Sequence, residues 1–87
     1  MFVIIVYDLG EKRVGKGCKF LRRYLDWVQN SVFEGEITER QLAEIEHGLG
    51  SFIDKEEDSV RFYILRTEDA LKVKVMGIEK ADTCTII

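Results

Sequence analysis

Hydrophobic residues divide the first third of the chain into an apolar run followed by a segment of helical period. Residues 2–7 are all β-branched or aromatic, which predicts a central strand buried on both faces. From residue 11 to residue 26, Val14, Cys18, Leu21 and Leu25 recur on one helical face. Basic residues occupy the opposite face, so we expect a surface helix with a basic side in solvent.

Four further segments follow the first helix. Residues 27–33 are rich in aromatic and β-branched residues and precede Glu-Gly-Glu, which predicts a strand. Thr38 and Gln41 have the spacing of a capping box at the start of an apolar stripe, which predicts a helix over 38–53. Residues 59–66 and 71–78 alternate between apolar and polar positions, which predicts two more strands.

We interpret these segments as an α+β fold, a ferredoxin-like βαββαβ sandwich in one domain over residues 1–87, with a core over 1–80. Both helices would cover one face of the antiparallel sheet and leave the other bare. Because the first strand is apolar on both sides, a second copy packed face to face is the simplest cover for that patch. The β-prone tail, residues 81–87, is expected to form an extra C-terminal strand that pairs with the partner chain.

Composition narrows the class of protein. The chain has 87 residues, of which 46% are hydrophobic and 33% charged, which is typical of a small globular domain. Its apolar runs are far shorter than the ~20 residues needed to cross a bilayer, and residues 2–7 lack the basic leader of a signal peptide. Cys18 and Cys84 form no metal-binding or disulfide pattern. We therefore expect a cytoplasmic protein with two spectator thiols.

Charge is distributed unevenly along the chain, although the net charge is only −3. Residues 12–23 hold six of the thirteen basic residues, and residues 34–58 hold nine of the sixteen acidic ones. The first group could bind phosphates through salt-sensitive contacts, or it could simply be a solvated helix face. Its members are Lys12, Arg13, Lys16, Lys19, Arg22 and Arg23.

Asp8 is the only acidic residue at the end of the central strand. A magnesium ion takes carboxylate oxygens together with waters and substrate phosphates, and a symmetric dimer would supply a second Asp8. The alternative is that Asp8 caps the following helix, with Glu11 as its reciprocal partner. From the residues alone the cap is the favoured interpretation. The single histidine, His47, falls on the second predicted helix and is expected at the surface.

Several segments together resemble the small CRISPR-associated endoribonuclease family of spacer acquisition. They are Val6 to Leu9, Lys12-Arg13, Tyr24 to Gly35 and Glu57 to Tyr63, and the most specific part is Gln-x-Ser-Val-Phe-Glu-Gly over residues 29–35. One departure is visible, because some members carry an arginine where this chain has Trp27. That arginine's contribution to a nuclease site therefore does not carry over.

The resemblance implies a homodimer whose sheets pack face to face, with Asp8 and its symmetry mate on opposite sides of a cleft that holds Mg²⁺. It also implies a role as a bridge between dimers of the CRISPR integrase, spanning the duplex to be inserted. With it, metal binding becomes the favoured role of Asp8. Tyr7 and Phe33 would lie near Asp8, where they could stack on exposed bases or simply pack in the core.

The resemblance thus implies a CRISPR adaptation protein: a homodimeric adaptor of the integrase that binds double-stranded DNA or single-stranded RNA and has magnesium-dependent endonuclease activity. Asp8 would be the catalytic and metal-binding residue, and the nucleic-acid contacts would come from Lys12, Arg13, Lys16, Lys19, Arg23, Tyr7 and Phe33. Two alternatives remain: a purely non-catalytic bridge in the integrase complex, and a small regulatory domain that binds a ligand.

Overall fold

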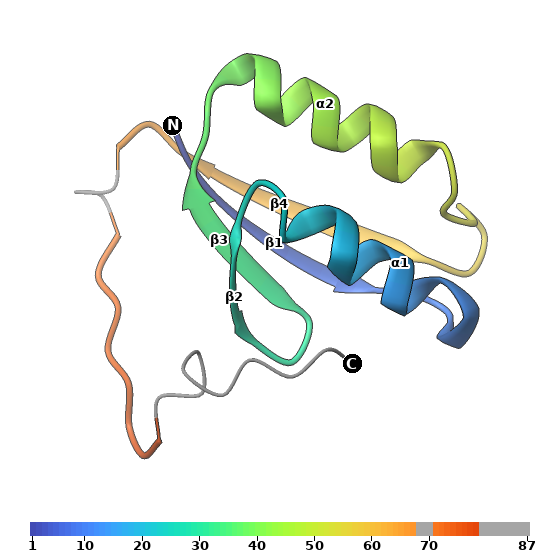
Figure 1. The fold of residues 1–87 in the computed structure, drawn as a ribbon. Helices are drawn as coiled ribbons and strands as arrows, with labels where there is room; N and C mark the ends of the chain where they lie inside the picture. The colour runs from blue at the N-terminus through green and yellow to red at the C-terminus, as the bar shows by residue number, and fades with distance from the viewer. Residues whose placement is uncertain (68–70, 79–87) are drawn as a thin grey trace.

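A computed structural model describes residues 1–67 and 71–78 of the chain. Within these residues the chain forms four strands and two helices in the order βαββαβ (Figure 1). The elements are β1 (Phe2–Asp8), α1 (Glu11–Leu21), β2 (Asp26–Gln29), β3 (Val32–Glu36), α2 (Glu39–Gly50) and β4 (Ser59–Leu65).

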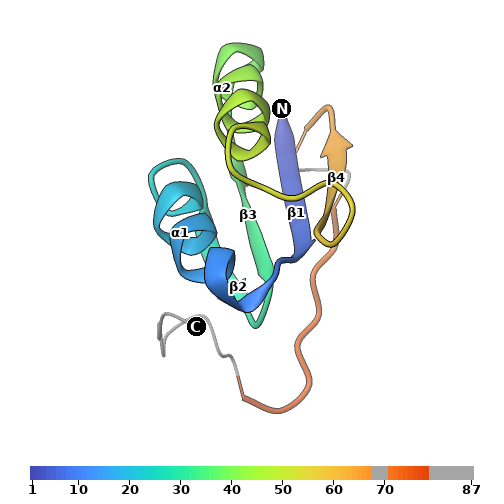
Figure 2. The ribbon, with the colours of Figure 1, turned by 90° about the vertical axis from the view of Figure 1, so that its right-hand side faces the viewer.

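The four strands form one antiparallel sheet in the order β2-β3-β1-β4, and both helices lie on the same face of it (Figure 2). This arrangement is the ferredoxin-like α+β fold, so the predicted fold class is confirmed. Of the helices in the described part of the chain, neither has the length and apolar character that spanning a membrane requires.

Alternation along β1 directs every second side chain into the core between sheet and helices. Val3, Ile5 and Tyr7 point to this side, and all three are buried. The helices contribute Leu21 from α1 and Ile45 from α2, each fully buried in the same cluster. The helix α2 starts with the predicted capping box, since Thr38 and Gln41 exchange side-chain and backbone hydrogen bonds.

The order βαββαβ of the predicted fold is found, but the six segments predicted for it run strand, helix, strand, helix, strand, strand, and they differ from the structure at two places near the first helix. The segment predicted as one strand over 27–33 is a hairpin in which β2 and β3 turn at Asn30 and Ser31. Asn30 has φ +41°, a left-handed conformation that asparagine tolerates better than most residues. The first helix ends at Leu21 rather than at residue 26, because a turn over 22–24 leads directly into β2.

The predicted strand over 71–78 was also wrong for the single chain. This segment has no regular secondary structure, although Val73, Val75, Met76 and Ile78 alternate or cluster as apolar residues and are exposed. A strand needs a neighbour to pair its backbone groups, and the segment joins neither edge of the four-stranded sheet. The predicted C-terminal strand over 81–87 lies outside the described residues.

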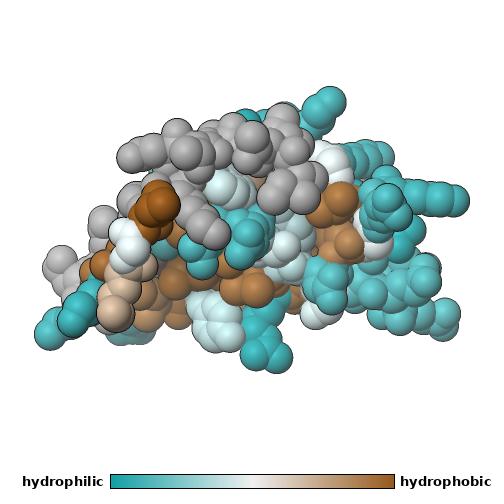
Figure 3. All heavy atoms as spheres, turned by 90° about the horizontal axis from the view of Figure 1, so that it is seen from below, coloured by the Kyte–Doolittle hydropathy of each residue, from teal (hydrophilic) through white to brown (hydrophobic). Residues whose placement is uncertain are grey.

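The sheet face opposite the helices carries the alternate side chains of β1 and its neighbours. Ile4 and Val6 lie on this face beside Tyr63 of β4, and Val6 and Tyr63 are 37% and 48% exposed. Figure 3 shows this side of the molecule, where apolar surface extends between hydrophilic flanks. We call it the open face.

Candidate functional site

Asp8 is the last residue of β1 and lies on the open face, opposite Ser59 of β4. Its side chain is exposed at a hollow of about 450 Å³. The hollow is formed by the turn from β1 into α1, the first turn of α1 and the loop before β4, and its lining residues are Asp8, Leu9, Gly10, Glu11, Lys12, Arg13 and Glu57.

The capping interpretation of Asp8 is wrong. Helix α1 starts at Glu11, its N-cap is Gly10, and no side chain donates or accepts a cap hydrogen bond there. The helix therefore begins beyond the reach of an Asp8 cap, which leaves the carboxylate of Asp8 at the rim of the hollow. An exposed carboxylate at this position is available to a ligand.

A second carboxylate, that of Asp58, lies behind the turn between β1 and α1 and binds the turn rather than the helix amides. Its side chain is completely shielded from solvent and accepts four hydrogen bonds. The donors are the Gly10 amide at 2.8 Å, the Asp54 amide at 2.8 Å, and Nε and Nη2 of Arg13 at 2.5 and 3.1 Å. We call this group the Asp58 clamp. The hydrogen bonds from Arg13 and from the two backbone amides hold the pKa of Asp58 well below its usual range.

Arg13 therefore has a structural task that the sequence did not reveal. Its guanidinium binds Asp58 through two nitrogens and lies 3.5 Å from the exposed carboxylate of Glu57. The side chain is only 23% exposed, whereas Lys12, Lys16 and the other predicted phosphate ligands on α1 are exposed. Sequence reasoning assigned no role to Asp58, although this aspartate directly precedes a predicted strand and lies in a segment that carries the family resemblance.

The oxygen donors around Asp8 suit a hard cation such as Mg²⁺ in chemistry, but one chain supplies too few of them. Within residues 1–67 and 71–78, no three His, Cys, Asp or Glu side chains gather in a group able to hold a metal. Mg²⁺ commonly uses one or two protein carboxylates and completes its shell with water and phosphate oxygens. Two such carboxylates, one from each of two chains, would fit that cation.

The exposed basic residues lie where the helical period predicted. Lys12, Lys16, Lys19 and Arg23 are all exposed, the first three along α1 and Arg23 in the turn after it. We call these four the basic face. Among these four, Lys12 is the residue that also lines the hollow of Asp8. The ammonium of Lys16 lies 4.9 Å from the ring centroid of Phe52, which holds this side chain against the surface.

Tyr7 and Phe33 are core residues, which corrects their prediction as base-stacking contacts. Phe33 is fully buried, Tyr7 is 4% exposed, and their ring centroids are 6.0 Å apart on the helix side of the sheet. The Tyr7 hydroxyl lies 2.9 Å from the buried thiol of Cys18, and burial together with this hydrogen bond raises the pKa of Tyr7. A ring enclosed by the core has no face available to a base.

Trp27, the residue at which the sequence departs from the expected family pattern, has a local structural role. Its indole Nε1 donates to the carbonyl of Asn30 at 3.0 Å, which closes the β2–β3 hairpin.

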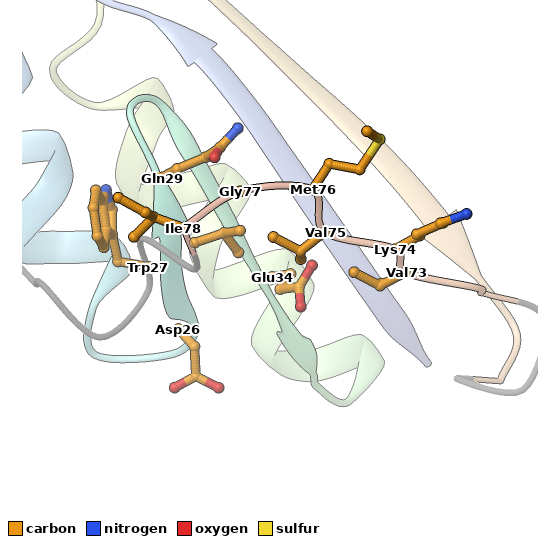
Figure 4. Close-up of a pocket in the computed structure, with 11 residues that line it drawn as sticks. Asp26, Trp27, Gln29, Glu34, Val73, Lys74, Val75, Met76, Gly77 and Ile78 are labelled. Carbon is orange, nitrogen blue, oxygen red and sulfur yellow. The ribbon is translucent and has the colours of Figure 1, made fainter.

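A larger hollow of about 810 Å³ lies beside Trp27, between β2, β3 and residues 73–78 (Figure 4). None of the predicted site residues lines this hollow. His47 is exposed on α2 as expected.

Comparison with known proteins places this geometry in a family. The sequence profile described as "CRISPR associated protein Cas2" matches residues 1–73. A protein named CRISPR-associated endoribonuclease Cas2 2 from Archaeoglobus fulgidus is 51% identical over 92% of this chain and 87% of its own length. The CRISPR-associated endoribonuclease Cas2 of Thermotoga maritima is 44% identical over 94% of both chains.

Solved structures give the same result. A crystal structure of Cas2 aligns with a TM-score of 0.85 and 45% identity, covering 100% of this chain and 98% of its own. The Streptococcus pyogenes Cas2 structure at pH 6.5 aligns with a TM-score of 0.78 and 35% identity, covering 88% of this chain and 100% of its own. With a matching profile, whole-length relatives and a shared fold, this chain belongs to the CRISPR-associated Cas2 family.

Proposed function

We propose that this protein acts in CRISPR spacer acquisition as a homodimer that binds nucleic acid, contacts the integrase and cleaves phosphodiester bonds in RNA or DNA with Mg²⁺. The observation that carries the proposal is the exposed Asp8 carboxylate at the end of β1, on the same side of the sheet as the apolar open face. The relatives' name, endoribonuclease, supports cleavage of RNA.

The open face supports the proposed dimer. Its exposed apolar side chains favour burial against a second copy, since each Å² of apolar surface removed from water contributes about 25 cal/mol. A twofold axis near the end of β1 would bring two Asp8 carboxylates together and complete a set of oxygen donors for Mg²⁺. When bound, the ion would polarise a phosphate and lower the pKa of a water molecule.

The residues around Asp8 would then have distinct tasks. Asp8 would hold the ion, and Lys12 at the rim of the same hollow would attract a phosphate oxygen of the substrate. The rest of the basic face would bind the backbone of a longer duplex without regard to its sequence. Such contacts suit an adaptor that holds DNA for the integrase.

Replacing Asp8 by Asn tests the metal site. We expect nuclease activity of the purified dimer to fall by at least about 100-fold, because the amide removes the anionic ligand. Dimerisation measured by sedimentation should not change. Asp26→Asn is a matched control, since Asp26 is also exposed but lies on β2, outside the hollow. Full activity in Asp8→Asn would contradict a catalytic role.

The same variant separates nuclease from adaptor. If Asp8→Asn loses nuclease activity but still supports spacer integration and binds the integrase, the protein works as a non-catalytic bridge. If integration also fails while the dimer persists, cleavage is part of its physiological work. An adaptor role as the main physiological work is supported by the residues that line the hollow of Asp8, because they include no histidine that could act as a base.

Charge reversal on the basic face tests nucleic-acid binding. The double variant Lys19→Glu and Arg23→Glu should weaken duplex binding, and the slope of log K against log salt should fall by about 0.9 for each phosphate that the variant no longer neutralises. Lys16 is left intact because its packing on Phe52 would confuse binding with stability. Lys55→Glu, in the exposed loop after α2, is the control. An unchanged salt slope in the double variant would rule out this surface.

A further inference from the structure

Hydrogen bonds of the Asp58 clamp hold the turn that follows Asp8. Oδ1 of Asp58 accepts from the amide of Gly10, two residues after Asp8, and Oδ2 accepts from the amide of Asp54. Arg13, in the first turn of α1, binds the same carboxylate through Nε and Nη2. One buried carboxylate thus ties together the β1–α1 turn, the start of α1 and the loop before β4.

The clamp also reaches Asp8 through the sheet. Asp58 immediately precedes Ser59, and Ser59 is the cross-strand neighbour of Asp8 at the end of the β1–β4 ladder. Asp8 is therefore flanked on both sides by backbone that Asp58 fixes: Gly10 after it along the chain, and Ser59 beside it on the next strand. A displacement of Asp58 would be transmitted to Asp8 by both routes.

Packing around Gly10 leaves no room for a side chain at this position. A Cβ atom on Gly10 would collide with Nη2 of Arg13 and stand 3.2 Å from its Cζ, so only glycine lets the guanidinium approach this closely. The charges within the clamp compensate each other, because the Asp58 carboxylate and the Arg13 guanidinium form a bidentate pair. The clamp therefore contributes little net charge to the hollow, and its influence on Asp8 is geometric.

We propose that Asp58 and Arg13 are positioning residues that set the metal affinity of Asp8 by fixing the β1–α1 turn. This inference rests on the proposed function of Asp8 as a metal ligand. Residues that orient a metal ligand without touching the metal commonly change metal affinity by about 10- to 100-fold when they are replaced. In this protein the carboxylate of Asp58 and the guanidinium of Arg13 would have that role.

The test is Mn²⁺ binding, measured by electron paramagnetic resonance on the full-length dimer at one salt concentration, for the wild type and four variants. The variants are Asp58→Asn, Arg13→Lys, Glu57→Gln and Asp8→Asn. Asp58→Asn places an amide NH₂ group among hydrogen-bond donors, and Arg13→Lys keeps the charge but loses the bidentate geometry. Both should weaken Mn²⁺ binding by about tenfold or more. Glu57→Gln removes one negative charge from the same hollow and keeps all four hydrogen bonds of Asp58, while it loses the exposed 3.5 Å ion pair with Arg13. Its affinity should change by about twofold at most, because the Glu57 carboxylate is 71% exposed.

A second readout is independent of the metal. Hydrogen exchange at the Gly10 amide should be slow in the wild-type protein and faster in both clamp variants. Asp58→Asn weakens the acceptor of this amide, and Arg13→Lys weakens the pairing that holds the Asp58 carboxylate in place. If Asp58→Asn fails to fold, judged by circular dichroism, Arg13→Lys carries the comparison.

The outcomes separate this inference from the function on which it rests. Equal weakening in Asp58→Asn and Glu57→Gln, with Arg13→Lys unaffected, would show a simple charge effect and overturn the positioning role. If Asp8→Asn binds Mn²⁺ as tightly as the wild-type protein does, the proposed role of Asp8 as a metal ligand is wrong. In that case, unchanged hydrogen exchange at the Gly10 amide in the clamp variants would also contradict a role of Asp58 and Arg13 in fixing the turn. Faster exchange would support that role without any metal.

Discussion

At the scale of single residues, two aspartates near the end of β1 differ in environment rather than in chemistry. Asp8 is exposed and its carboxylate makes no hydrogen bond with the described part of the chain, whereas Asp58 is shielded and accepts four. An exposed carboxylate is free to bind a cation, and a fully paired one stabilises local structure. The surroundings of each side chain therefore favour binding for Asp8 and architecture for Asp58.

The depressed pKa of Asp58 makes a prediction about acid stability. Because the folded-state pKa lies below the unfolded value of about 4, the pairing of Asp58 stabilises the fold above pH 4 and loses that contribution as pH falls below it. Stability measured by urea unfolding should therefore decrease between about pH 4 and pH 2 more steeply in the wild-type protein than in Asp58→Asn. Parallel pH profiles of the two proteins would contradict the prediction.

At the scale of elements, helix α1 combines a packed side with an exposed basic one. Cys18 and Leu21 are buried against the sheet, while Lys12, Lys16 and Lys19 are exposed. The two helices meet where the ring of Phe20 on α1 lies over Gly48 of α2. Glycine allows this contact because a side chain at position 48 would occupy the space of the ring.

A matched pair of glycine substitutions tests this helix packing. Gly48→Ala should destabilise the protein by about 1–3 kcal/mol, because its Cβ would collide with Cζ, Cε1 and Cε2 of Phe20. Gly15→Ala, in open space within α1, should stabilise it by about 0.5–1 kcal/mol through helix propensity. Thermal unfolding of both variants measures the difference. Stabilisation by both substitutions would show that Phe20 moves aside at little cost.

At the scale of the whole molecule, the sheet has helices on one side only. The open face exposes Val6 and Tyr63, and the apolar side chains of the segment 73–78 are also exposed. A second chain that covered these side chains would remove apolar surface from water and so stabilise the assembly. The same assembly would provide strand edges for residues 71–78.

A lysine on the open face tests the dimer. Val6→Lys should raise the dimer dissociation constant by about tenfold or more, because burying an unpaired charge at an interface costs several kcal/mol. Ala43→Lys adds the same charge to the exposed surface of α2 and should leave the constant unchanged. Sedimentation equilibrium over a range of concentrations measures both. Equal dissociation constants for the two variants would place the interface elsewhere.

The sequence by itself determined the elements whose signal is local. The apolar run of β1, the period of α1 and the capping box at Thr38 are set by neighbouring residues, so these elements and the ferredoxin-like fold were predictable. The basic face was predictable for the same reason, since helical spacing fixes which residues share a side. The family resemblance added the prediction that Asp8 is a metal ligand.

Only the tertiary structure decided what depends on contacts between distant segments. The hairpin at Asn30 depends on the pairing of β3 with β1. Residues 71–78 alternate like a strand, but they form none because they do not pair with either edge of the sheet. Tyr7 and Phe33 were assigned to the core by the helices above them. The Asp58 clamp joins residues 45 and 48 positions apart, and no local pattern encodes such a meeting. Burial and pairing across the fold, which sequence periodicity does not specify, fixed the roles of these residues.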